Sequence, residues 1–136
     1  MVNSLVIFDT SVFVGHLRTG RHQERIESVT GLIRTSAVVL AELWRGATKP
    51  AERAFLKDLE KNHPVLSPTE RNWLESGQIL GKMHADKGFS PEKLRDLHFD
   101  VLIALTARSH GARLITSNPA DFELIRGYRE FRHEMW

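Results

Sequence analysis

Short uninterrupted hydrophobic runs alternate along the chain with longer segments in which hydrophobic residues recur every three or four positions. The short runs predict strands at residues 4–9, 32–36, 64–66 and 113–116. The longer segments predict helices at residues 12–17, 21–30, 37–44, 51–61, 70–85, 99–110 and 121–125. Short hydrophobic strands that alternate with helices along the chain are typical of an α/β domain with a mainly parallel sheet.

The predicted helix at residues 99–110 follows a polar lead at residues 92–96. This boundary places Asp100 in the opening turn, where the helix dipole favours a negative charge. Asp96 or Asp100 could cap the helix. The longer hydrophobic run follows Asp100, which favours Asp100 as the functional residue and Asp96 as an accessory acid or cap. Gly111 is expected to end the helix.

Three carboxylates interrupt or border the hydrophobic runs. Asp9 ends the first predicted strand, Glu42 lies within the predicted helix 37–44, and Asp100 precedes five hydrophobic residues. An unpaired buried carboxylate is costly, and none of these runs contains Lys or Arg. Asp9 could merely cap a helix, and Glu42 could point outward. The pattern nevertheless favours catalytic acids that converge on a divalent metal ion.

The turn after the last predicted strand offers a fourth position. Ligand sites of parallel sheets lie at the carboxyl ends of the strands, so this turn and Asp9 should share one edge. The turn contains the amide of Asn118 and the carboxylate of Asp121, and Asp121 could instead cap a short helix. A site made only of oxygen ligands suits Mg²⁺ or Mn²⁺ rather than Zn²⁺.

Composition narrows the possible functions. The chain of 136 residues fits one domain, residues 1–136, and has no cysteine, which excludes disulfides and thiolate metal sites. The histidines lack zinc-binding spacing, and His22 is expected at the surface or the edge of the core. A net charge of +2 permits nucleic-acid binding without requiring it. Three basic residues could hold the phosphates of a nucleic acid: Arg18, Arg45 and Arg108.

The chain lacks the signals of export or membrane insertion. Residues 1–4 contain no basic residue, and the hydrophobic stretch after them is too short for a signal peptide. No run approaches the roughly 20 apolar residues of a membrane helix. We therefore expect a cytoplasmic protein with no membrane partner.

Taken together, the motifs resemble those of the PIN-domain family and, within it, the VapC-type toxins of bacterial toxin–antitoxin pairs. The likeness covers nearly the whole chain and rests on residues 6–12, 35–46, 99–107 and 111–122. Each segment alone is weakly specific, whereas their order and spacing are specific. The resemblance implies a three-layer α/β/α PIN-like domain and an Mg²⁺- or Mn²⁺-dependent endoribonuclease, a hydrolase that cuts RNA phosphodiester bonds with metal-activated water. It also implies a small VapB-like antitoxin bound in a heteromeric complex, and a homodimer.

The resemblance also assigns roles to residues. Asp9, Glu42 and Asp100 match the three acids of the family. The fourth acidic position falls at Asn118, with Asp121 three residues further on, so either could complete the metal site. Hydroxyl residues that accompany the acids in the family match Thr10 or Ser11, and Thr116.

Two other classes of function fit parts of the sequence. A non-catalytic PIN-like module that binds RNA or protein fits the substitution at Asn118. A phosphatase of the haloacid dehalogenase type fits the loosely similar strand around Asp9, but that chemistry usually needs a second aspartate where this chain has Ser11. A nuclease that cuts DNA rather than RNA also stays open.

Overall fold

The computed structural model describes residues 4–136 of the chain; Met1–Asn3, on which the expected absence of an export signal partly depends, lie outside the described residues. Five strands form one sheet in the order β3-β2-β1-β4-β5. All four pairs of neighbouring strands are parallel. The strands are β1 (Leu5–Phe8), β2 (Leu32–Ser36), β3 (Val65–Leu66), β4 (Arg113–Thr116) and β5 (His133–Met135).

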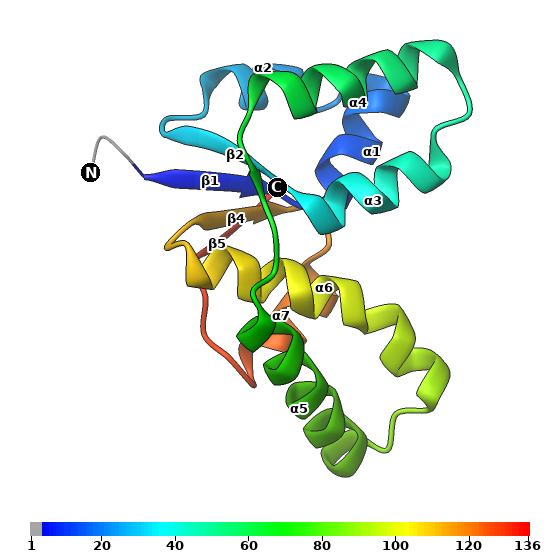
Figure 1. Ribbon diagram of the computed structural model, residues 1–136, viewed down its shortest axis with the longest axis vertical. Coiled ribbons are helices and arrows are strands. Elements are labelled where there is room, and N and C mark those ends of the chain that lie inside the picture. The colour runs from blue at the N-terminus through cyan, green and yellow to red at the C-terminus, as the bar shows by residue number, and fades with distance from the viewer. Residues whose placement is uncertain (1–3) are drawn as a thin grey trace.

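Helices cover both faces of the sheet (Figure 1). The helices of the described chain are α1 (Thr10–Thr19), α2 (Gln23–Ser28), α3 (Ala37–Gly46), α4 (Pro50–Asn62), α5 (Glu70–Lys87), α6 (Pro91–Ser109) and α7 (Pro119–Arg126). Figure 1 shows α1 to α4 on one side of the sheet and α5 to α7 on the other. The strand order explains this division, because right-handed crossovers that move in opposite directions from β1 place their helices on opposite faces. The predicted three-layer α/β/α fold is confirmed.

The core lies where β1 and β4 pass between the helix layers. Val6 and Ile7 of β1 and Leu114 and Ile115 of β4 are fully buried. A strand covered on both faces is hydrophobic at successive positions instead of alternating, which explains the uninterrupted runs. On α6, Val101 to Leu105 are all buried, so this helix is the main hydrophobic element of its layer.

The start of α6 differs from the prediction. The polar lead and the predicted helix form one helix that begins at Pro91, and the Ser90 side chain caps it by accepting from the backbone N–H of Lys93. Serine at the N-cap with proline at the next position is a strong start signal, which outweighs the polar character of residues 92–96. Asp96 is therefore an exposed helical residue and no cap, and Asp100 lies in the middle of α6 without support from the helix dipole.

The ends of the other helices and strands differ less from the predicted ones. Gly111 has a φ of +63°, as expected for the residue that ends α6. Helix α7 begins at Pro119, so Asp121 lies in its first turn and Asn118, not Asp121, is the N-cap residue. Strand β5 was not predicted, because His133–Met135 forms no hydrophobic run and depends on pairing with β4. Within residues 4–136, no helix is long and apolar enough to cross a membrane.

Candidate metal centre

Asp9 lies at the carboxyl end of β1 and is 3% exposed. Its Oδ2 atom accepts hydrogen bonds from Ser11 Oγ at 2.7 Å and from Thr116 Oγ1 at 2.8 Å. The backbone N–H of Ser11 approaches the same oxygen at 3.4 Å, so Asp9 does cap α1. Among the described residues, all hydrogen bonds to this side chain converge on Oδ2. The capping role thus leaves Oδ1 as the oxygen available to a cation.

Glu42 faces Asp9 from α3 and does not point outward. Thr10, the first residue of α1, donates from Oγ1 to Glu42 Oε1 at 2.7 Å. Burial raises the pKa of Glu42 above its ordinary value, and the charge of Asp9 raises it further. The Thr10 hydrogen bond and the positive charge of Arg45 act in the opposite direction. Glu42 and Asp9 therefore lie close enough to repel each other.

Asp100 brings a third carboxylate from α6. Its pKa is raised to about 8, first by burial and then by the negative charges of Asp9, Asp121 and Glu42. A side-chain hydrogen bond with Asp121 contributes in the same direction. Two carboxyl groups can share a hydrogen bond only if one of them holds a proton. The metal-free site therefore holds a proton near neutral pH.

Asp121, from the first turn of α7, is the fourth carboxylate of this group. Asn118 Nδ2 donates to Asp121 Oδ2 at 3.1 Å, and the backbone N–H of Asn118 donates to Thr116 Oγ1 at 3.0 Å. Asn118 is thus fixed at the end of β4 and holds Asp121 by its amide nitrogen. The structure brings Asp121, rather than Asn118, into direct contact with Asp100.

The four carboxylates come from four elements that meet at the carboxyl edge of the sheet, and this donor set fits a divalent cation. The charges of Asp9, Glu42 and Asp121 all oppose the ionisation of Asp100, a repulsion that a cation would relieve. Carboxylate oxygens are the ligands that Mg²⁺ and Mn²⁺ prefer. Within residues 4–136, no three His, Asp or Glu side chains already have the spacing of an assembled metal site. The four acids are instead coupled through their charges, and Asp100 and Asp121 also through a hydrogen bond.

The predicted basic residues lie at different distances from these acids. Arg18 is exposed on α1 and lines the same groove as Glu42. The Arg45 guanidinium lies 5.5 Å from the centre of the Phe99 ring, so it reaches from α3 to α6 beside Asp100. Arg108 lies in the last turn of α6, about 12 Å along the helix from Asp100. The structure therefore does not bring Arg108 to the acids.

One basic residue near the site was missed in the sequence. Lys93 Nζ lies 4.0 Å from Asp121 Oδ1, which places a positive charge beside the fourth carboxylate. Lys93 and Asp100 are separated by two helical turns and so share one face of α6. The Ser90-Pro91 start of α6 could have revealed Lys93 in the sequence. Only a helix that includes residues 92–96 places Lys93 on the same face as Asp100.

Comparisons with known proteins agree with this architecture. The family model of the PIN domain matches residues 6–128. No curated protein sequence matches the chain. Among solved structures, the chain is similar to VapBC2 from Rickettsia felis bound to a DNA fragment from their promoter, with 20% identity, a TM-score of 0.72 and coverage of 97% of this chain and 98% of that chain.

Two further solved structures have the same fold. DNA-bound VapBC from Salmonella typhimurium shares 24% identity, with a TM-score of 0.69 and coverage of 98% of each chain. VapBC-5 from Mycobacterium tuberculosis, a member of the VapBC family of toxin–antitoxin systems, shares 24% identity, with a TM-score of 0.62 and coverage of 98% of this chain and 99% of that chain. Since the family model spans most of the sequence, the chain belongs to the PIN domain family.

Proposed function

We propose that the chain is a VapC-type toxin, a metal-dependent endoribonuclease in which Asp9, Glu42, Asp100 and Asp121 hold Mg²⁺ or Mn²⁺. Membership of the PIN domain family and the similarity to solved VapBC structures support this class of function. The observation that carries the proposal is the gathering of Asp9, Glu42 and Asp121 around Asp100 at one edge of the sheet: burial first, and then the negative charges of these three acids, raise the pKa of Asp100 to about 8.

Each acid has a neighbour that orients it. Ser11 and Thr116 fix Asp9 through Oδ2, Thr10 holds Glu42, and hydrogen bonds to Asp100 and Asn118 hold Asp121. Asp9, Glu42, Asp100 and Asp121 would hold the cation, and Asp100 would release its proton on binding it. A bound divalent ion supplies Lewis acidity, which activates water and offsets the negative charge that develops on a phosphodiester.

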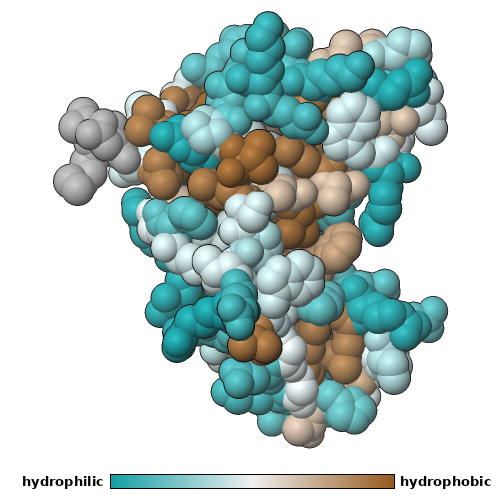
Figure 2. Space-filling model, in the orientation of Figure 1, coloured by the Kyte–Doolittle hydropathy of each residue, from teal (hydrophilic) through white to brown (hydrophobic). Residues whose placement is uncertain are grey.

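A notch beside the acids could receive the substrate. Figure 2 shows the surface hollowed between α3 and the N-terminal half of α6. Arg45 on α3 and Lys93 on α6 carry positive charge near the acids. Cations at such a site attract the phosphate groups of single-stranded RNA, and binding that depends on them weakens as the salt concentration rises.

The proposal includes a small antitoxin as partner. A groove next to Thr10 and Glu42 has a mostly apolar lining that includes Val14, Leu17, Leu43, Ala47 and Leu56. Apolar side chains of a partner could fill this groove, and a cationic side chain could then reach Glu42. The same contacts would block access of RNA to the acids, which is how an antitoxin would inhibit the enzyme.

We also propose that the protein forms a homodimer. Trp73 and Leu74 on α5 are 50% and 65% exposed, which is unusual for such large hydrophobic side chains. Helix α5 lies in the helix layer opposite the one that contains the groove described above (Figure 1). A second copy could therefore cover these two side chains without competing with an antitoxin.

The two other classes of function have less support. A phosphatase of the haloacid dehalogenase type usually needs a second aspartate two residues after the first, and in this chain that position is Ser11, whose hydroxyl donates to Asp9 Oδ2 at 2.7 Å. A non-catalytic module was favoured by Asn118 in place of an acid, and Asp121 supplies that missing charge next to Asp100. Nuclease activity therefore has the stronger chemical basis.

RNA cleavage by the purified protein tests this proposal. We expect wild-type protein to cut single-stranded RNA with Mg²⁺ or Mn²⁺, and a chelator or Asp9→Asn to remove the activity. Asp58→Asn is the matched control, because Asp58 is an exposed aspartate on α4 and should not affect cleavage. Cleavage that persists in the chelator or in Asp9→Asn would contradict the proposal. Single-stranded DNA of the same sequence tests whether RNA is the preferred substrate.

A further inference from the structure

His22 is a buried histidine at the start of α2, in contact with the edge of the sheet that carries the acids. It is 2% exposed, although the sequence placed it at the surface or the edge of the core. Its Nε2 atom lies 3.2 Å from Ser117 Oγ. The backbone N–H of Ser117 donates to Ser11 Oγ at 2.9 Å, and Ser11 Oγ donates to Asp9 Oδ2 at 2.7 Å. A continuous chain of polar contacts thus joins His22 to Asp9.

Trp136 packs against His22 and against the end of β1 that carries Asp9. Its ring centre lies 5.5 Å from that of His22 and 5.6 Å from that of Phe8, the residue before Asp9. Its backbone N–H donates to the carbonyl oxygen of Thr116 at 2.7 Å. Ser11 and Thr116, whose hydroxyl groups donate to Asp9, are therefore both tied to the pair formed by His22 and Trp136.

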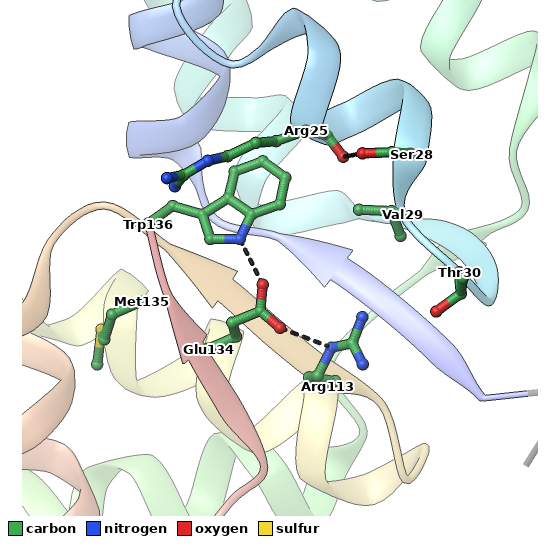
Figure 3. Close-up of a pocket in the computed structure, with 8 residues that line it drawn as sticks. All are labelled: Arg25, Ser28, Val29, Thr30, Arg113, Glu134, Met135 and Trp136. Atoms are coloured by element: carbon green, nitrogen blue, oxygen red, sulfur yellow. Dashed lines mark hydrogen bonds and ion pairs between the residues drawn. The ribbon is translucent and has the colours of Figure 1, made fainter.

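The outer side of Trp136 is also fixed (Figure 3). The Arg25 guanidinium lies over the indole ring, 5.6 Å from its centre. The indole N–H donates to Glu134, and Glu134 pairs with Arg113 at 3.8 Å. Contacts on both sides leave the Trp136 ring little freedom to move. His22 therefore packs against an indole ring that is itself held in place, and this contact keeps the Nε2 atom of His22 directed toward Ser117.

We infer that His22 is a positioning residue that holds Asp9 in its metal-binding orientation through Ser117 and Ser11. This inference rests on the proposed function, because it assumes that Asp9 is a metal ligand. Hydrogen bonds to a ligand from residues behind it set its orientation, and their removal typically weakens metal binding about 10- to 100-fold. Burial lowers the pKa of His22, with the charges of Arg21 and Arg25 next, so the ring is neutral at pH 7. A neutral ring can hold Ser117 without adding positive charge behind Asp9.

Two substitutions at His22 separate the polar contact from the packing. In His22→Phe, the new ring fills the space against Trp136 but cannot form a hydrogen bond with Ser117. In His22→Gln, the side-chain amide can still form a hydrogen bond with Ser117. In calorimetric titrations of the full chain with Mn²⁺, we expect His22→Phe to bind about tenfold more weakly. His22→Gln should stay within about threefold of wild type. His16→Phe is the control, because His16 also packs on an aromatic ring, that of Phe55, outside this chain of contacts.

Activity provides a second readout. For RNA cleavage at a fixed subsaturating Mn²⁺ concentration, we expect His22→Phe to lower kcat with KM for RNA unchanged, because the RNA contacts are intact. If His22 had only a structural role, His22→Phe would lower the melting temperature without lowering kcat selectively over KM. Wild-type protein that binds Mn²⁺ and cuts RNA, together with a His22→Phe variant of unchanged Mn²⁺ affinity, would contradict this inference alone. Wild-type protein that binds Mn²⁺ but cuts no RNA would contradict only the proposed function.

Ser117→Ala tests the same chain of contacts if His22→Phe folds poorly. It removes the oxygen that His22 contacts and keeps the backbone N–H that donates to Ser11. We expect the same tenfold loss of Mn²⁺ affinity, and the double variant should lose no more than either single variant. Additive losses, or wild-type affinity in Ser117→Ala, would overturn the inference.

Discussion

Asp100 on α6 and Asp121 on α7 share a hydrogen bond between their carboxyl groups. Burial of Asp100, then the charges of Asp9, Asp121 and Glu42, and finally this bond raise the pKa of Asp100 to about 8, so the metal-free site keeps a proton that an isolated aspartate would lose. The bond joins two elements that are distant from the first two acids in sequence. It also places Asp121, and not Asn118, beside Asp100.

The stability of the metal-free protein should fall as the pH rises. The pKa of Asp100 is raised from 3.8 to about 8 on folding, so its protonated form is favoured in the folded state. The resulting stabilisation is complete below about pH 4 and is lost as the pH rises to about 8. Asparagine at position 100 cannot ionise, so the stability of Asp100→Asn should not fall in this way. The free energy of unfolding of Asp100→Asn, relative to that of wild type, should therefore be about 1–3 kcal/mol higher at pH 8.5 than at pH 5.5. Urea unfolding in a chelator measures this, and an equal difference at both pH values would contradict it.

Thr10 should be needed for tight metal binding. Thr10→Val keeps the shape of the side chain but removes the donor that lowers the pKa of Glu42. We expect the Mn²⁺ concentration for half-maximal binding to rise about 3- to 10-fold. The same change in Thr19→Val, at the exposed end of α1, should leave binding unaltered. Wild-type affinity in Thr10→Val would show that Glu42 needs no such support.

Asp121 should matter more than Asn118 for the metal. Asp121→Ala removes a charge next to Asp100, whereas Asn118→Ala removes a side chain that holds Asp121. Mn²⁺ titration should show a loss of at least about tenfold for Asp121→Ala and a smaller loss for Asn118→Ala. The reverse order would identify Asn118 as the direct ligand, and no change in either variant would exclude both.

Lys93 should contribute to RNA binding, and Arg108 should not. Lys93 lies beside Asp121, whereas Arg108 lies two turns of α6 away from Asp100. Lys93→Gln should raise KM for RNA and reduce the dependence of log KM on log salt concentration by about one unit. Arg108→Gln is the matched control, with KM and its salt dependence close to wild type. Equal effects of the two variants would argue against a phosphate contact at Lys93.

The sequence predicted the acids better than it predicted their neighbours. Asp9, Glu42 and Asp100 were visible because each breaks a hydrophobic run, and burial of a carboxylate is costly wherever it occurs. The wrong start of α6 arose because the polar residues 92–96 form an exposed turn of helix, which hydrophobic periodicity alone does not detect. Correcting this boundary moves Asp100 from an opening turn to mid-helix.

The contacts that link Asp9 to His22 and Trp136 could not be predicted from local sequence patterns. His22 is buried because α2 brings it against Ser117 and Trp136, which are about a hundred residues further along the chain. Strand β5 likewise forms by pairing with β4 without a hydrophobic run of its own. Such long-range pairings leave no periodic signal in the segments themselves, and only the folded structure reveals them.

Proton release on metal binding tests whether a cation replaces the proton that the Asp100 carboxyl holds among the four acids. Calorimetric titration of wild-type protein with Mn²⁺ at pH 6.5, in buffers of different ionisation enthalpy, measures the protons released. We predict release of about one proton per bound ion, with Asp9→Asn binding far more weakly. Absence of Mn²⁺ binding, or tight binding without proton release, would contradict the proposed site.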